Sequence, residues 1–304
     1  MRIVSLLPSA TEMVCALGAG DQLVGISHEC DFPDEVRGRA VVTSARIHPS
    51  SSSKAIDAAV RAVLVEDAIS IYRVDDELLG ELAPDVVLTQ DLCEVCAVSL
   101  DDVRAAVARL AHRDAVSIVS LSPTRLGDVW NDLEAVARAI GRADEGARVR
   151  ATLEARVRDV AARAAACATR PRVVSIEWLE PIMLGGTWMP ELIELAGGTA
   201  VGVRAGQPAP TVSPQELAAL APDVVLVKPC GFPIARTMDE RALLESTIAR
   251  VVAPAARVYV SDGNAFFNRP GPRLVESLEI MAACVHPEAF GDLASKHRAV
   301  IASL

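Results

Sequence analysis

One stretch of sequence occurs twice, and this internal repeat constrains the fold more than any other feature of the chain. The segment VDDELLGELAPDVVLT covers residues 74–89, and VSPQELAALAPDVVLV covers residues 212–227. The two segments align without a gap and share the run Leu-Ala-Pro-Asp-Val-Val-Leu. Each predicts a short helix, a Pro-Asp turn and a strand. The unbroken apolar run of the strand is typical of a parallel sheet that is covered on both faces.

A second correspondence supports the repeat. The β-rich run RIVSLL begins at residue 2, and RVVSIEW begins at residue 172. Each run precedes a short predicted helix that ends at a glycine, Gly18 in one case and Gly197 in the other, and glycine is the usual left-handed residue at a helix end. We therefore predict two similar α/β lobes, an N-terminal lobe over residues 1–122 and a C-terminal lobe over residues 171–304.

The segment between the lobes, residues 123–170, has a helical pattern. It is rich in Ala, Leu, Arg and Glu, and its apolar residues recur at helical spacing. We predict one helix to about Ile140, a break at Gly141 and a long helix to about Cys167. The expected fold class is α/β, with two Rossmann-like lobes whose sheets are mainly parallel and which are joined by a long α-helical spine. A helical connection is stiffer than a pair of crossing strands.

Composition excludes several classes of function. The chain has 304 residues and a net charge of −10, and its basic residues are scattered, which argues against nucleic acid as a partner. No stretch reaches the ~18 apolar residues of a transmembrane segment. The opening MRIVSLLPSATE lacks the features of a secretory signal. We expect a cytoplasmic protein if the sequence is full length, and a periplasmic or otherwise extracytoplasmic one if an export signal was removed.

Polar and aromatic side chains follow the predicted strands in both lobes. Ligands of open parallel sheets bind beyond the carboxyl ends of the strands, so we expect these side chains to line an interlobe site for a small-molecule ligand. The predicted ligand-binding residues are Ser9, His28, Glu29, Trp178, Trp188, Asp262, Asn264, Phe266, Phe267 and Arg269.

Several of these residues have a simpler interpretation. Loops at strand ends are polar in most proteins, and Ser9 could serve only as a helix N-cap. Trp178 and Trp188 could form an aromatic wall of the site or belong to the core, whereas Trp130 is predicted to be a core residue of the spine. The remaining histidines are predicted to lie at the surface, namely His48, His112, His286 and His297.

The seven cysteines fall into two groups. Cys15, Cys167 and Cys284 lie in predicted helices, where we expect small core residues. The other four follow predicted strands and form a candidate metal site of Cys30, Cys93, Cys96 and Cys230. Thiolates at such spacing suit zinc or an iron–sulfur cluster, and His28 could replace one of them. The alternatives are ordinary buried thiols and a reactive Cys-x-x-Cys pair.

Three longer motifs resemble one known family. They are IVSLLPSATEMVCALGAGDQLVGISHECDFP, LGGTWMPELIELAGG and DGNAFFNRPGPRLVESLEIMAACV. They are similar to motifs of substrate-binding proteins of ABC importers of the helical-spine class, class III, and the pattern is closest to that of cobalamin-binding members. The resemblance implies a binding protein for cobalamin, another corrinoid or a related metal chelate, with an importer permease as its partner. The positions that match the family's cleft loops are Ser9, Glu29, Trp178, Trp188 and the loop 262–269.

An enzyme is the alternative to a binding protein. His28 beside Cys93 or Cys96 could form a base–thiolate pair, and Glu29, Glu177 and Asp262 could act as acids or bases if burial raises their pKa. The chain has no nucleophile elbow, P-loop or dinucleotide fingerprint. No catalytic residue is therefore assigned, and the alternative remains a cytoplasmic metal- or thiol-dependent enzyme, with zinc or an iron–sulfur cluster, on the same fold.

Overall fold

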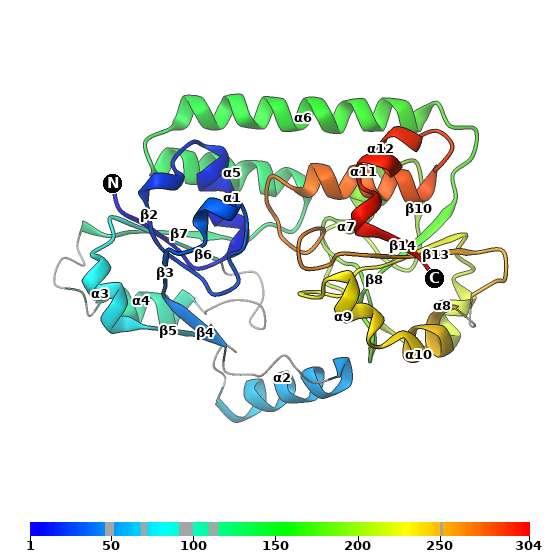
Figure 1. Ribbon diagram of the computed structural model, residues 1–304, viewed down its shortest axis with the longest axis horizontal. Coiled ribbons are helices and arrows are strands. Elements are labelled where there is room, and N and C mark those ends of the chain that lie inside the picture. The colour runs from blue at the N-terminus through cyan, green and yellow to red at the C-terminus, as the bar shows by residue number, and fades with distance from the viewer. Residues whose placement is uncertain (46–51, 68–71, 91–99, 109, 111–114, 250–251) are drawn as a thin grey trace. The chain divides into compact units, whose positions relative to one another are not determined.

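The chain divides into two compact units. The computed structural model describes residues 1–45, 52–67, 72–90, 100–108, 110, 115–249 and 252–304 (Figure 1). Unit 1 comprises Met1–Ser51, Ala55–Pro123 and Gly127–Thr152, and unit 2 comprises Ser52–Lys54, Thr124–Leu126 and Leu153–Leu304. The boundary between the units falls inside the long helix α6 (Ala143–Ala165).

Unit 1 is built on a parallel sheet. Its strands are β1 (Ile3–Ser5), β2 (Leu23–Ile26), β3 (Ala40–Val41), β6 (Val86–Gln90) and β7 (Ser117–Leu121), in the order β3-β2-β1-β6-β7. Every neighbouring pair in this order is parallel. One face carries α1 (Pro8–Ala16) and α5 (Leu126–Ala139), and the other carries α3 (Asp76–Leu82) and α4 (Leu100–Ala108), as Figure 1 shows. The same region also contains a short antiparallel pair of strands, β4 (Thr43–Ala45) and β5 (Tyr72–Val74), and the helix α2 (Ser53–Asp67).

Unit 2 has a sheet with a parallel centre and antiparallel edges. Its strands are β8 (Arg172–Trp178), β9 (Ile182–Leu184), β10 (Thr199–Ala200), β11 (Thr211–Val212), β12 (Val224–Val227), β13 (Arg257–Ser261) and β14 (Ile301–Ser303). The order is β11-β9-β8-β12-β13-β14, with β10 also paired to β8. The pairs β8–β12 and β12–β13 are parallel, whereas β9, β11 and β14 are joined in antiparallel fashion.

Helices also cover both faces of the sheet in unit 2. The helices are α7 (Met189–Leu195), α8 (Pro214–Ala219), α9 (Ile234–Met238), α10 (Arg241–Leu244), α11 (Leu274–Val285) and α12 (Gly291–Lys296). Apolar side chains of β8, β12 and β13 pack with those of α8 and α10 in one buried cluster. The opposite face is covered by α7 and α11 (Figure 1). Burial of apolar surface on both faces explains the unbroken apolar runs of the central strands.

The internal repeat corresponds to the same local structure in both units. Asp85 Oδ2 accepts a hydrogen bond from the backbone N–H of Arg2 at 2.7 Å, and Asp223 Oδ2 accepts one from the N–H of Arg172 at 2.7 Å. In each unit the same arginine's guanidinium donates to the carbonyl of the leucine that begins the repeated run. The alanine that follows this leucine has a positive φ, 41° in one unit and 44° in the other. The repeated residues therefore end a helix and join it to the first strand of their unit.

The spine was predicted correctly as two helices with a break. α5 and α6 are separated at Gly141, whose φ of 70° suits the left-handed residue at a helix end. Trp130 is buried, as predicted. The predicted fold class is thus confirmed, while the proposed boundaries of the three domains stay a prediction. None of the helices in the described ranges combines the length and apolar character that crossing a bilayer requires.

The predicted surface position of two histidines is wrong. His286 and His297 are only 8% and 7% exposed. His286 Nε2 lies 3.1 Å from the carbonyl oxygen of Gly197, and His297 Nε2 lies 2.7 Å from Glu279 Oε2. Hydrogen bonding to distant groups allows both imidazoles to be buried. His48 and His112 lie outside the described residues.

Candidate functional site

The carboxyl ends of the parallel strands of unit 1 carry a hydrogen-bonded group around His28, which follows β2. Thr43 Oγ1 donates to Ser27 Oγ at 3.0 Å and accepts the backbone N–H of His28 at 3.0 Å. His28 Nδ1 lies 2.7 Å from the same hydroxyl oxygen. A hydroxyl has one hydrogen, so Nδ1 must be the donor to Thr43 and Nε2 must hold the lone pair of the neutral imidazole.

The other side of the His28 ring faces Glu29 and Tyr72. His28 Nε2 is buried without a hydrogen-bond partner in the described chain and lies 3.5 Å from Glu29 Oε1. Tyr72, on β5, donates from its hydroxyl to the same carboxylate oxygen at 3.4 Å, and its ring meets the imidazole edge-on at 5.0 Å. Burial lowers the pKa of His28, and the charge of Glu29 opposes this shift. Tyr72 was not predicted from the sequence, although it is one of only two tyrosines in the chain.

Two further predicted residues of unit 1 are buried beside α1. Ser9 lies within the first turn of the helix and is not its N-cap, because Leu7 occupies that position without a side-chain cap. Cys30 Sγ lies 3.1 Å from Thr11 Oγ1, in contact with the same helix. Both side chains face the interior, so they shape the edge of the sheet in this structure and expose little surface.

Unit 2 presents an aromatic stack at the end of β8. The ring centroids of Trp178 and Phe232 are 5.3 Å apart with an interplanar angle of 56°. The guanidinium of Arg236 lies 4.3 Å above the ring centroid of Phe232, a cation–π contact. Trp178 is half-buried, and its Nε1 is a buried donor with no hydrogen-bond acceptor in the described residues.

Trp188 and Phe267, two of the predicted ligand-binding residues, are buried in unit 2. Trp188 is 5% exposed and Phe267 is 0% exposed. Trp188 Nε1 donates to the carbonyl oxygen of Phe267 at 2.8 Å, and the N–H of Phe267 donates to Ser277 Oγ at 2.8 Å. The two buried rings therefore pack beneath the loop 262–269, on the side of the protein interior.

The loop 262–269 holds its own conformation through its predicted polar residues. Asp262 Oδ1 accepts the backbone N–H groups of Asn264 and Ala265 at 2.9 and 2.8 Å. Arg269, which is buried, donates to Asn264 Oδ1 at 3.1 Å. Phe266 is partly exposed, with the guanidinium of Arg273 5.5 Å above its ring centroid. Phe266 therefore offers more aromatic surface to a ligand than Phe267 does.

The proposed metal site is not assembled within the described residues. Cys30 belongs to unit 1, and Cys230 is an exposed residue that follows β12 in unit 2. Cys93 and Cys96 lie outside the described residues. Within the described ranges, no three His, Cys, Asp or Glu side chains gather as metal ligands do. The zinc or iron–sulfur site stays a prediction.

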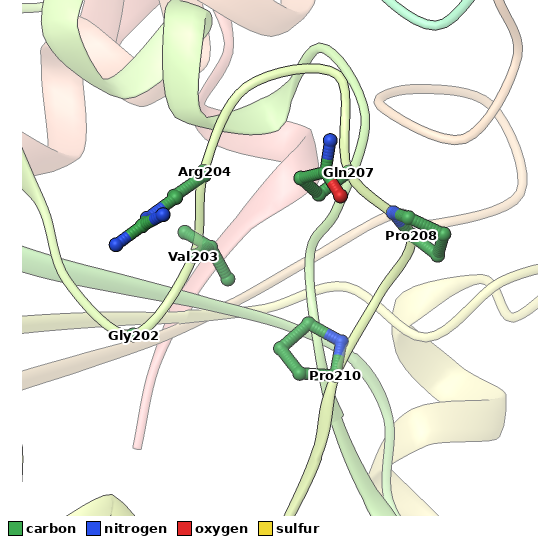
Figure 2. Close-up of a pocket in the computed structure, with 6 residues that line it drawn as sticks. All are labelled: Gly202, Val203, Arg204, Gln207, Pro208 and Pro210. Carbon is green, nitrogen blue, oxygen red and sulfur yellow. The ribbon is translucent and has the colours of Figure 1, made fainter.

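A pocket of about 450 Å³ lies in the loop between β10 and β11 (Figure 2). Figure 2 shows that its walls come from one continuous segment of unit 2, and the lining residues are Gly202, Val203, Arg204, Gln207, Pro208 and Pro210. The segment is anchored because the Thr187 N–H donates to the carbonyl oxygen of Gln207 at 2.7 Å, and the Gly206 N–H donates to that of Thr187 at 2.9 Å. This pocket was not predicted from the sequence.

Comparison with known proteins identifies the family. A family model described as periplasmic binding protein matches residues 3–253. The chain belongs to the periplasmic binding protein family. No curated protein is similar enough to count as a match.

Solved structures of other family members share the fold. A periplasmic heme binding protein from Pseudomonas aeruginosa is 20% identical, with a TM-score of 0.69 over 94% of this chain and 93% of that chain. The periplasmic heme-binding protein RhuT from Roseiflexus sp. RS-1 is 20% identical, with a TM-score of 0.67 over 96% and 98%. The periplasmic vitamin B12 binding protein BtuF of Vibrio cholerae is 19% identical, with a TM-score of 0.66 over 93% and 96%.

The family assignment confirms the predicted resemblance to helical-spine substrate-binding proteins of ABC importers. This periplasmic binding protein is therefore of the ABC-importer type. The comparisons lend no support to the enzyme alternative or to a cytoplasmic location. They leave the identity of the ligand open, because the neighbours named above bind heme or vitamin B12.

Proposed function

We propose that this protein binds cobalamin, or a related metal chelate, at the carboxyl edges of its two sheets and delivers it to the permease of an ABC importer. By analogy with the named neighbours, it acts outside the cytoplasm.

The observation that carries the proposal is the aromatic stack of Trp178 on Phe232. A corrin or porphyrin ring is a large, flat and largely apolar surface, and aromatic side chains pack well against such a surface. Trp178 is half-buried, so part of its ring is open to a ligand. The exposed part of the ring is apolar, whereas its indole N–H is buried, so Trp178 would contact the ligand through the face or edge of the ring.

The polar group at the edge of unit 1 suits the rim of a corrinoid. Glu29 is partly exposed and its carboxylate can accept hydrogen bonds from the amide groups of the macrocycle. The Tyr72 hydroxyl orients this carboxylate by donating a hydrogen bond to it. Since burial favours the neutral form of His28, that imidazole places no positive charge beside Glu29.

A titration with three metal chelates tests the proposal. Purified protein is titrated with cobalamin, with heme and with a ferric siderophore, while absorbance and tryptophan fluorescence are recorded. We expect saturable quenching by cobalamin with one ligand bound per chain. If only the siderophore binds, or none of the three does, the assignment to a tetrapyrrole-type ligand is wrong. If heme alone binds, the ligand is a related chelate and not cobalamin.

A further inference from the structure

Lys228 is a fully buried lysine directly after β12. It is 0% exposed, and it is one of only three lysines among the 30 basic residues of the chain. Burying an ammonium group is costly unless acceptors surround it. The side chain was not singled out from the sequence, because its acceptors lie 40 and 51 positions away.

The ammonium group of Lys228 joins three segments of unit 2. Its Nζ donates to Asn268 Oδ1 at 2.8 Å, in the loop 262–269. It also donates to Glu177 Oε2 at 3.4 Å, near the end of β8. The same carboxylate oxygen accepts the backbone N–H of Gly186 at 3.3 Å, from the turn after β9. One cation thus holds a strand end, a turn and the loop together.

The loop is also seated directly on the backbone around Lys228. Asn268 Nδ2 donates to the carbonyl oxygen of Lys228 at 3.1 Å and to that of Gly263 at 2.8 Å. A Cβ at Gly263 would lie 2.0 Å from the carbonyl oxygen of Pro229. This distance is a steric clash, so position 263 accepts only glycine without a shift of the backbone. Asn268 therefore uses both its side-chain oxygen and its side-chain nitrogen in hydrogen bonds to Lys228. Both bonds require the loop 262–269 to keep its present conformation.

We propose that Lys228 is a positioning residue for ligand binding, which clamps the loop 262–269 through Asn268 so that Phe266 and the end of β8 present one fixed surface. This role rests on the proposed function, in which the ligand is cobalamin or a related metal chelate. A well-packed apolar side chain at position 228 would suit β12 equally well, but it would leave the Asn268 oxygen and Glu177 without their shared donor. A charged clamp favours one loop conformation over its alternatives.

Amine labelling tests the clamp without any ligand. Lys54 and Lys296 are exposed, with side chains 73% and 51% accessible, so they serve as internal references for the labelling rate. In the wild-type protein, brief acetylation followed by mass spectrometry should modify Lys228 at least tenfold more slowly than either reference. Asn268→Ala should raise the rate at Lys228 several-fold. Asn131→Ala, a surface asparagine of α5, is the matched control and should leave it unchanged.

Ligand affinity tests the role in binding. Lys228→Met and Asn268→Ala should each weaken cobalamin binding by about tenfold or more, because either change removes the hydrogen bond between Lys228 and the loop.

The two measurements separate this proposal from the proposed function. If wild-type protein does not bind cobalamin, the proposed function fails, and the labelling of Lys228 still decides whether the clamp exists. If Asn268→Ala leaves labelling of Lys228 unchanged, the clamp is refuted. If labelling rises but cobalamin affinity stays as in wild type, Lys228 stabilises the loop without positioning it for the ligand. Since Lys228→Met could impair folding, Asn268→Ala carries the test by itself.

Discussion

Replacing Glu279 by glutamine should destabilise unit 2 by about 3 kcal/mol at neutral pH, an estimate that follows from the pKa of this carboxylate. Glu279, on α11, is buried and accepts hydrogen bonds of 2.7 Å each from Arg156 on α6, from Lys296 and from His297. Burial alone would raise its pKa, but these three donors lower it to about 2. The ordinary value for glutamate is about 4.3, and a difference of roughly two units corresponds to about 3 kcal/mol.

The sign of the effect gives the pH dependence. The pKa of Glu279 is depressed in the folded state, so its contribution is complete above about pH 4.3 and is lost as pH falls toward 2. Urea unfolding of wild type and Glu279→Gln, followed by tryptophan fluorescence at pH 7, 5, 4 and 3, measures the difference. It should be largest at pH 7 and should shrink below pH 4.

A neighbouring glutamate provides the matched control. Glu276 pairs with the same arginine, Arg156, at 2.8 Å but is more exposed, so Glu276→Gln should cost less than about 1 kcal/mol. A loss below about 0.5 kcal/mol for Glu279→Gln, or a loss that does not change between pH 7 and pH 3, would refute the reasoning.

Three other predictions concern the aromatic stack, the repeat and the cysteines. Trp178→Ala should weaken cobalamin binding by about tenfold with an unchanged melting temperature, while Trp178→Phe should bind within about threefold of wild type; equal affinity in all three proteins would make Trp178 a bystander. Asp223→Asn should cost about 1 kcal/mol in urea unfolding because it weakens the bond to the Arg172 N–H, whereas Asp239→Asn at an exposed position should change stability by less than about 0.5 kcal/mol; equal losses would show that the bond contributes nothing specific. Anaerobically purified protein should contain stoichiometric zinc or iron that a Cys93→Ser/Cys96→Ser variant lacks, if the predicted thiol site exists; metal-free wild-type protein that keeps its ligand affinity in the variant would leave these as ordinary cysteines.

The parts of the fold that were predictable are those encoded by local pattern. The repeated Leu-Ala-Pro-Asp-Val-Val-Leu run identified a strand of each sheet, β6 and β12, because a helix end, a proline and an apolar run are all readable within a few residues. In the second copy a capping box of Ser213 and Glu216, which is also a local pattern, begins α8. The edge strands β9, β11 and β14 were missed, since runs of two or three residues have no period to detect.

The site was harder to predict because burial depends on distant residues. Trp178 ends β8 and Trp188 directly precedes α7, yet only Trp188 is enclosed, since its indole donates to the carbonyl of Phe267, 79 positions away. Lys228 was missed in the same way: a lysine normally stays in water, and only its partners Glu177 and Asn268 make burial possible. The sequence pointed to the loops of the candidate site, but it could not separate their exposed side chains from their buried ones.

Hydrogen exchange with and without cobalamin tests the central claim most directly, because it locates the ligand on the chain. The account predicts that cobalamin slows amide exchange in peptides that cover residues 27–31, 177–180 and 262–269, while a peptide over α12 exchanges at the same rate. Protection confined to other segments, such as the pocket loop 202–210, or no change anywhere at saturating cobalamin, would contradict it.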